Sequence, residues 1–199
     1  MERPRPAEPE QLAHSRDHSC AAGQGGALRR RLLLWREAQL LRRALKLAGE
    51  PNLLLDLSPE AGRCWPLLAE HDNRVILAAG PSQQRLDAVL AAQPAGLAER
   101  VRVFQGTAAA LLLPDNAVDC ILGIGLLPCG AEALQLRQQL RELRRVTRDT
   151  LILSLPAGRF PAGKAIEGEL VQAGFDILGR YGLLPGYSTS WIYVVRKDD

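Results

Sequence analysis

The hydrophobic positions of residues 28–48 repeat with the period of an α-helix. Apolar side chains follow one another at steps of three and four, at Leu34, Ala38, Leu41, Leu45 and Ala48. This spacing places them on one stripe of a helix, which is typical of a helix packed on a core. Gly49 and Pro51 follow directly, and residues of these types commonly end helices. We therefore predict a helix over 28–48.

From residue 51 onwards, short apolar runs alternate with segments of helical period. The predicted strands are 53–57, 74–79, 100–104, 119–124 and 150–155. The predicted helices are 66–70, 82–93, 132–147 and 165–173. Short continuous apolar runs are typical of parallel strands buried on both faces. Two last runs, 175–178 and 190–195, can pair as an antiparallel hairpin at the sheet edge. The pattern predicts an α/β fold with a mostly parallel sheet, helices on both of its faces and a C-terminal antiparallel hairpin.

Length and composition indicate a single globular domain. The chain has 199 residues, of which 47% are hydrophobic and 24% are charged, enough for one domain with its own core. Residues 1–27 are rich in Pro, Gly and polar types without a sustained period, so we predict a disordered tail there and one domain over 28–199. No apolar run is long enough to span a bilayer, and the N-terminus lacks the apolar stretch of a secretory signal. We expect a cytoplasmic protein without a transmembrane segment.

The cysteines and histidines give no metal-binding pattern. The four cysteines are Cys20, Cys64, Cys120 and Cys129. No two of them have the close spacing of a zinc site or a disulfide framework. His14 and His18 lie near Cys20, but a fourth ligand is missing. Cys129 has no histidine near it in the sequence, so we interpret it as an inert loop cysteine rather than a nucleophile. We expect no metal.

The positive charge is concentrated near the N-terminus. Residues 1–50 contain ten Lys and Arg against six Asp and Glu, whereas the rest contains fifteen against sixteen. The helix 28–48 carries seven cations, at Arg29, Arg30, Arg31, Arg36, Arg42, Arg43 and Lys46. We favour a solvated face on a helix packed against the sheet. The alternative is a helix that binds an anionic surface or nucleic acid. The sequence also leaves open whether the chain forms a homodimer.

Four segments of the chain occur in the order and at the spacing of one known family. Residues 53–63 (LLLDLSPEAGR) stand where that family has a hydrophobic strand, an Asp and a DxGxGxG turn. Residues 113–119 (LPDNAVD) are similar to its LPDNSFD segment, 140–146 (LRELRRV) to its LREIRRV helix, and 173–175 to its AGF. The chain thus resembles the class I S-adenosylmethionine (SAM) methyltransferases, of the type 11 group. The resemblance implies a Rossmann-like fold and methyl transfer from SAM to an unidentified small-molecule acceptor.

The resemblance also implies a cofactor site, with departures from the family pattern. The six matching positions are Asp56, Ser58, Glu60, Gly62, Gly80 and Thr107. Asp56 and Gly62 agree with the family's turn, where glycines let the backbone approach the ligand. Ser58 and Glu60 replace the first two glycines and add bulk and a negative charge near the SAM carboxylate. A Glu60 side chain that points into the crevice would leave no room for SAM.

The two later positions lack the family's carboxylates. Gly80 stands where an acidic residue commonly accepts hydrogen bonds from the ribose hydroxyls, and Thr107 stands where an Asp faces the adenine amino group. Two charge-assisted contacts of about 1.5–3 kcal/mol each are lost, which would weaken cofactor binding by roughly two orders of magnitude or more.

A purely local interpretation of the first turn is also open. Ser58 can serve as a helix N-cap, with Pro59 at the first helical position and Glu60 in the first turn. Two functions therefore remain. One is a small SAM-dependent methyltransferase with a divergent cofactor loop. The other is a non-catalytic homologue that keeps the fold as a binding or regulatory module.

Overall fold

The structure is a computed structural model that describes residues 24–58, 60–127, 133–156, 163–183 and 190–198. Its helices are α1 (Gln24–Leu47), α2 (Trp65–Leu68), α3 (Gln83–Ala91), α4 (Ala95–Ala98), α5 (Ala133–Val146) and α6 (Gly163–Gln172). Its strands are β1 (Leu53–Asp56), β2 (Val75–Gly80), β3 (Val101–Gln105), β4 (Val118–Gly123), β5 (Thr147–Pro156), β6 (Phe175–Gly182) and β7 (Ser190–Lys197). Each predicted helix and strand is present, and the short helix α4 is an addition that we did not predict.

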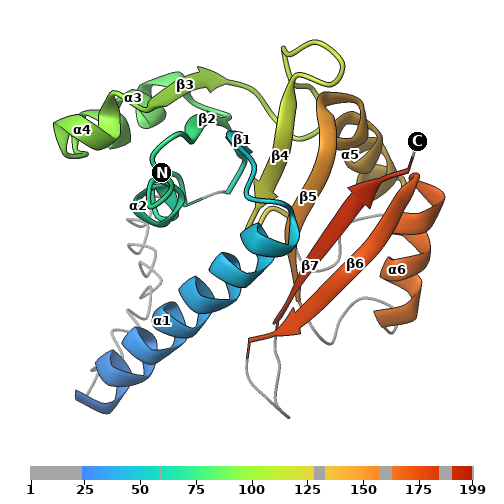
Figure 1. Cartoon of the computed structure of the whole chain (residues 1–199), viewed down its shortest axis with the longest axis horizontal. Helices are drawn as coiled ribbons and strands as arrows, with labels where there is room; N and C mark the ends of the chain where they lie inside the picture. Colours follow the sequence, from blue (N-terminus) through green and yellow to red (C-terminus); the bar gives the residue numbers. More distant parts are fainter. Residues whose placement is uncertain (1–23, 59, 128–132, 157–162, 184–189, 199) are drawn as a thin grey trace, which may run out of the picture.

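The seven strands form one sheet in the order β3-β2-β1-β4-β5-β7-β6 (Figure 1). The first five strands are parallel, and Leu55 of β1 stands between Leu77 of β2 and Ile121 of β4. Strand β7 lies between β5 and β6 and is antiparallel to both. The predicted α/β fold with a mostly parallel sheet and a C-terminal antiparallel hairpin is confirmed. In this hairpin the first strand, β6, is the edge strand of the sheet, and the second strand, β7, pairs with β5.

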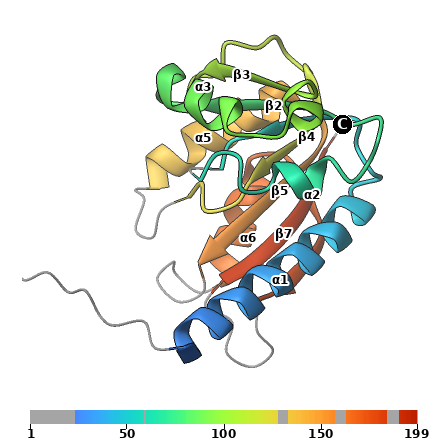
Figure 2. The same ribbon diagram turned by 90° about the vertical axis from the view of Figure 1, so that its left-hand side faces the viewer.

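Helices cover both faces of the sheet, as the apolar runs predicted. Successive strand residues point to opposite faces, so Leu54 and Leu55 belong to two different buried clusters. One cluster packs under α5 and α6 through Leu140 and Leu170, and the other packs under α1 and α2 through Leu45 and Trp65. The chain therefore builds a three-layer sandwich (Figure 2).

The order in which strands are added reverses at β1, and such a reversal leaves a crevice at the carboxyl ends of the adjacent strands. From β1 the chain adds β2 and β3 on one side and β4 and β5 on the other. The loops after β1 and β4 therefore leave the sheet toward opposite faces. Open parallel sheets bind ligands at such a switch point, beyond the carboxyl ends of the strands.

Several boundaries differ from the prediction, and those of α1, β5 and β6 differ by three or four residues: β6 continues to Gly182 instead of ending at residue 178. Helix α1 begins at Gln24 rather than at residue 28, because its first turn shows no apolar period that the sequence pattern could detect. The first 23 residues of the predicted tail lie outside the described residues. Strand β5 begins at Thr147, directly after α5 ends at Val146. Buried Thr147 pairs with Val118 there, so sheet pairing overrides the helical pattern.

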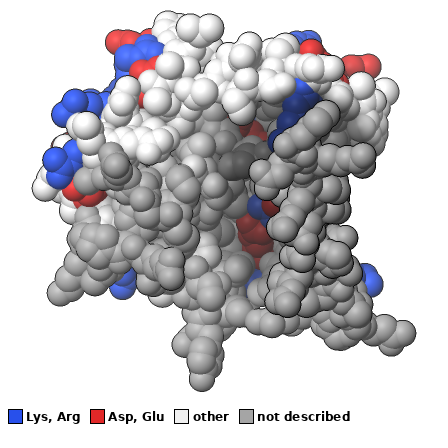
Figure 3. Space-filling view, turned by 180° about the vertical axis from the view of Figure 1, so that it is seen from behind, with Lys and Arg blue, Asp and Glu red and all other residues white. Residues whose placement is uncertain are grey.

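The described surface carries charges of both signs. On the face seen in Figure 3, the Lys and Arg side chains are interspersed with Asp and Glu. Among the described helices, none combines the length and the apolar character needed to cross a membrane.

Candidate cofactor site

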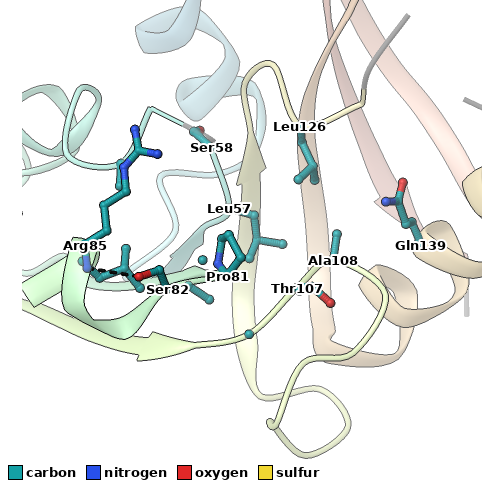
Figure 4. Close-up of a pocket in the computed structure, with 14 residues that line it drawn as sticks. Leu57, Ser58, Pro81, Ser82, Arg85, Thr107, Ala108, Leu126 and Gln139 are labelled. Carbon is teal, nitrogen blue, oxygen red and sulfur yellow. Dashed lines mark hydrogen bonds between the residues drawn. The ribbon is translucent and has the colours of Figure 1, made fainter. Parts of the chain in front are cut away.

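A cavity of about 340 Å³ opens where the carboxyl ends of β1, β2 and β3 meet (Figure 4). Its walls are mainly apolar and include Leu57, Ala79, Leu86, Ala108 and Leu126. Concave, mostly apolar sites with a few polar groups, of about 300–1,000 Å³, are typical of small-molecule binding. Three of the six predicted cofactor positions, Ser58, Gly80 and Thr107, line this cavity, whereas Asp56, Glu60 and Gly62 do not.

Asp56, at the end of β1, fixes the following loop through hydrogen bonds from a buried position. Its side chain is 2% exposed. One carboxylate oxygen accepts a hydrogen bond from the Ser58 backbone N–H, and the other accepts one from the Trp65 indole N–H, each at 3.0 Å. Burial raises the pKa of Asp56 above its ordinary value, and the bonds from Ser58 and Trp65 oppose that rise. Within the structure Asp56 organises the loop, and its predicted contact with a cofactor stays a prediction.

Ser58 connects two loops at the rim of the cavity. Its hydroxyl oxygen accepts a hydrogen bond of 3.1 Å from the backbone N–H of Ile124, just after β4. The helix that follows begins only at Trp65, with Pro66 in its first turn. The interpretation of Ser58 as a helix N-cap is therefore wrong, because the hydroxyl is used across the sheet rather than along the chain.

Glu60 is turned away from the cavity. Its side chain is 76% exposed, and its carboxylate lies 2.9 Å from the Arg63 guanidinium. Arg63 also forms an ion pair of 2.6 Å with Glu37 of α1, and this pair chiefly raises the pKa of Arg63 above its ordinary value. The negative charge of Glu60 thus has a cationic partner, and the clash with SAM that an inward Glu60 would cause is absent.

Gly62 is required by packing inside the protein. Its φ is +84°, and a Cβ at this position would lie 2.6 Å from Cγ1 of Val89 on α3. Residues other than glycine rarely adopt this left-handed backbone conformation. The glycine that the family pattern assigns to ligand approach here lets α3 pack against the loop.

The opposite wall of the cavity is open and carries no acidic side chain. A Cβ at Gly80, the last residue of β2, would meet the Leu86 side chain at an ordinary contact distance of 3.5 Å. The carbonyl oxygen of Gly80 accepts a hydrogen bond from Gly106, which lies directly before Thr107. No carboxylate is present among the described residues that line the cavity. The carboxylates that the sequence lacks at Gly80 and Thr107 are therefore not replaced by Asp or Glu side chains from elsewhere among the described lining residues.

Three lining residues with polar side chains were not predicted: Ser82, Arg85 and Gln139. Ser82 caps α3 through its hydroxyl, which accepts from the Arg85 backbone N–H at 3.4 Å. Arg85 is the one charged residue among the described lining residues. The side-chain oxygen of Gln139 is buried without a hydrogen-bond donor in the part of the chain that the structure describes. Its position on α5, three residues after buried Leu136, is a polar interruption of an apolar face and could have indicated a site.

The cysteines of the described residues are structural. Cys64 and Cys120 are free and buried, and burial raises the pKa of each thiol to about 12. Thiols in that state are poor nucleophiles. No cluster of three metal-ligating side chains occurs within the described ranges. His14, His18, Cys20 and Cys129 lie outside them.

Comparisons with known proteins show the architecture. No family model and no curated protein matches the sequence. Among solved structures, the putative sarcosine dimethylglycine methyltransferase from Galdieria sulphuraria aligns with a TM-score of 0.68 at 14% identity, over 83% of this chain and 86% of that one. The glycopeptide N-methyltransferase MtfA, solved with SAM, aligns with a TM-score of 0.64 at 15% identity, over 79% and 87%. The [4+2]-cyclase SpnF aligns with a TM-score of 0.64 at 18% identity, over 81% and 80%. The chain therefore has the class I fold of SAM-dependent methyltransferases.

Proposed function

We propose that this chain is a small SAM-dependent methyltransferase that binds SAM in the cavity at the carboxyl ends of β1, β2 and β3. One observation carries the proposal: the cavity is open at the switch point of a methyltransferase fold, and Glu60 pairs with Arg63 instead of entering it. The type 11 group remains the finer assignment that the sequence motifs favour.

The lining residues suit the adenosine part of SAM. Apolar walls at Ala79, Leu86 and Ala108 accept the faces of an adenine ring, and the Thr107 hydroxyl can accept a hydrogen bond from its amino group. The free side-chain oxygen of Gln139 offers a second acceptor on the far wall. When bound, SAM would supply an electrophilic methyl group. The protein's part is to exclude water and to hold the acceptor in line with that group.

The same residues predict weak affinity. The cavity lacks the two carboxylates that would face ribose and adenine, and it places Arg85 beside a ligand with a net positive charge. Each missing charge-assisted bond contributes about 1.5–3 kcal/mol, so we expect a dissociation constant roughly 100-fold or more above that of a site with both acids.

A second function, a non-catalytic binding module, is favoured by the Ser58 bridge. The bond from Ile124 to Ser58 places a hydroxyl where the family's glycine lets the methionine part of SAM approach the backbone. A site that excludes the methionine part of SAM at Ser58 but stays open at Gly80 would bind the nucleoside part alone, and no methyl group would then be available for transfer.

Calorimetric titration with SAM, S-adenosylhomocysteine and adenosine distinguishes these functions. The methyltransferase proposal predicts that SAM and S-adenosylhomocysteine bind more tightly than adenosine and raise the unfolding temperature as ligand linkage requires. Equal binding of all three ligands favours the non-catalytic module. The absence of any response at millimolar SAM contradicts SAM binding.

A further inference from the structure

Helix α1 has an exposed half with apolar side chains. Leu32 is 58% exposed and Trp35 is 57% exposed. Among the described side chains of this helix, 30–47, the fully buried ones lie between Leu40 and Leu45. The C-terminal half of α1 therefore packs on the sheet, and the N-terminal half leaves Leu34, at 42% exposed, as well as Leu32 and Trp35 in solvent. Leu32 and Trp35 are the most exposed pair, and their burial against a partner would be favourable.

Cations surround this apolar pair on the same helix face. Trp35 follows Leu32 by three residues, Arg31 precedes Trp35 by four, and Arg36 and Arg43 follow Leu32 by four and eleven. All five therefore face the same way on a helix of 3.6 residues per turn. In the described part of the chain, Arg31, Arg36 and Arg43 form no ion pair, whereas Arg42 pairs with Glu70. On the face of the molecule seen in Figure 3, by contrast, several cations have acidic neighbours.

The exposed half extends past the body of the protein. Glu37 is tied to Arg63 in the loop after β1, so the helix crosses the carboxyl edge of the sheet near its middle. The residues before Glu37 amount to roughly 20 Å of helix at 1.5 Å per residue. Figures 1 and 2 show this end of α1 standing clear of the sheet. The described part of the molecule therefore leaves Leu32 and Trp35 accessible to a flat partner.

A lipid surface matches both properties of this face. Arginines attract anionic headgroups, and Trp and Leu side chains partition into the boundary between headgroups and acyl chains. Nucleic acid would use the arginines but would give Leu32 no apolar environment. We propose that the outward face of α1, formed by Arg31, Leu32, Trp35, Arg36 and Arg43, docks on an anionic phospholipid surface. The proposal is independent of SAM binding.

Co-sedimentation of the full chain with vesicles tests the proposal. We expect binding to phosphatidylcholine vesicles that contain phosphatidylserine, little binding to pure phosphatidylcholine, and weaker binding as salt is raised. Replacing Arg31, Arg36 and Arg43 by Gln should lower the partition coefficient roughly 100-fold, since each cation near the surface contributes about 1 kcal/mol. Replacing Leu32 and Trp35 by Ser should lower it roughly tenfold or more.

A matched control removes three exposed arginines elsewhere, by changing Arg102, Arg141 and Arg148 to Gln, and should bind as the wild type does. All three variants should keep the wild-type circular dichroism, because the changed side chains lie outside the buried core. No binding to phosphatidylserine vesicles at low salt would overturn the proposal, as would equal loss in the control. Binding to RNA that needs the arginines but not Leu32 and Trp35, without vesicle binding, would assign the face to nucleic acid instead.

Discussion

The two sides of the cavity differ in whether their residues are already bonded and packed within the protein. Asp56 at the end of β1 and Ser58, Glu60 and Gly62 in the loop after it all have their bonds or packing partners within the protein, and of these four only Ser58 lines the cavity. At the ends of β2 and β3, Gly80 and Thr107 line the cavity without an acidic side chain, and Arg85 at the start of α3 lies in the same lining. The first wall is a structural element that borders a site, and the second is a surface that a ligand can contact. A motif that matches a cofactor loop can thus be retained for the fold, while the capacity to bind depends on residues outside the motif.

Replacement of Asp56 by Ala gives the largest expected effect, on the closed wall. The change leaves the Ser58 N–H and the Trp65 indole N–H without acceptors in a buried loop. Each orphaned donor costs about 1–3 kcal/mol, so the free energy of unfolding should fall by about 2–6 kcal/mol. Urea denaturation followed by fluorescence measures this. A loss below about 1 kcal/mol would show that Asp56 does not organise the loop.

Gly62→Ala should destabilise the same loop by a comparable amount, about 2–6 kcal/mol. The new Cβ meets Val89 at 2.6 Å on a backbone with φ of +84°, and strain and overpacking each cost about 1–3 kcal/mol. Thermal unfolding is the measurement, and Gly125→Ala is the matched control, since Gly125 also has positive φ but open space around its Cβ. Equal effects at both positions would mean that packing against α3 is not the reason for Gly62.

Ser58→Gly should lower stability and tighten SAM binding at the same time. The variant orphans the Ile124 N–H, at a cost of about 1–3 kcal/mol, but it restores the close backbone approach that a glycine permits. Ser58→Ala is the control: it removes the same hydrogen bond but keeps the Cβ, so it should lose stability without gaining affinity. If calorimetry finds unchanged SAM affinity in Ser58→Gly, the bridge does not restrict the ligand.

Gly80→Asp should have the smallest effect on stability, because a Cβ there meets the Leu86 side chain at an ordinary distance. The new carboxylate can accept hydrogen bonds from the ribose hydroxyls, which should tighten SAM binding by roughly tenfold or more. Gly80→Asn has the same size without the charge and should gain less. Similar gains in both variants would contradict a ribose at this wall.

The sequence predicted the fold well because the signals for it are local. The apolar period of residues 28–48 and the buried runs of β1, β2 and β4 each depend on a few adjacent residues. The site was predicted less completely, because contacts between distant residues decide it. Neither the Ser58 bond to Ile124 nor the ion pair of Arg63 with Glu37 follows from a spacing along the chain. The Glu60–Arg63 pair, by contrast, joins residues three positions apart and was readable from the sequence. Arg85 and Gln139 reach the cavity only through the packing of α3 and α5.

The most direct test of the account is a crystal structure of the full chain with S-adenosylhomocysteine. The account predicts density for the adenosine part against the wall formed by Gly80 and Thr107, with Glu60 still paired to Arg63 and turned away from the ligand. An empty cavity at a ligand concentration that saturates the protein in calorimetry, or a ligand bound elsewhere, would contradict it.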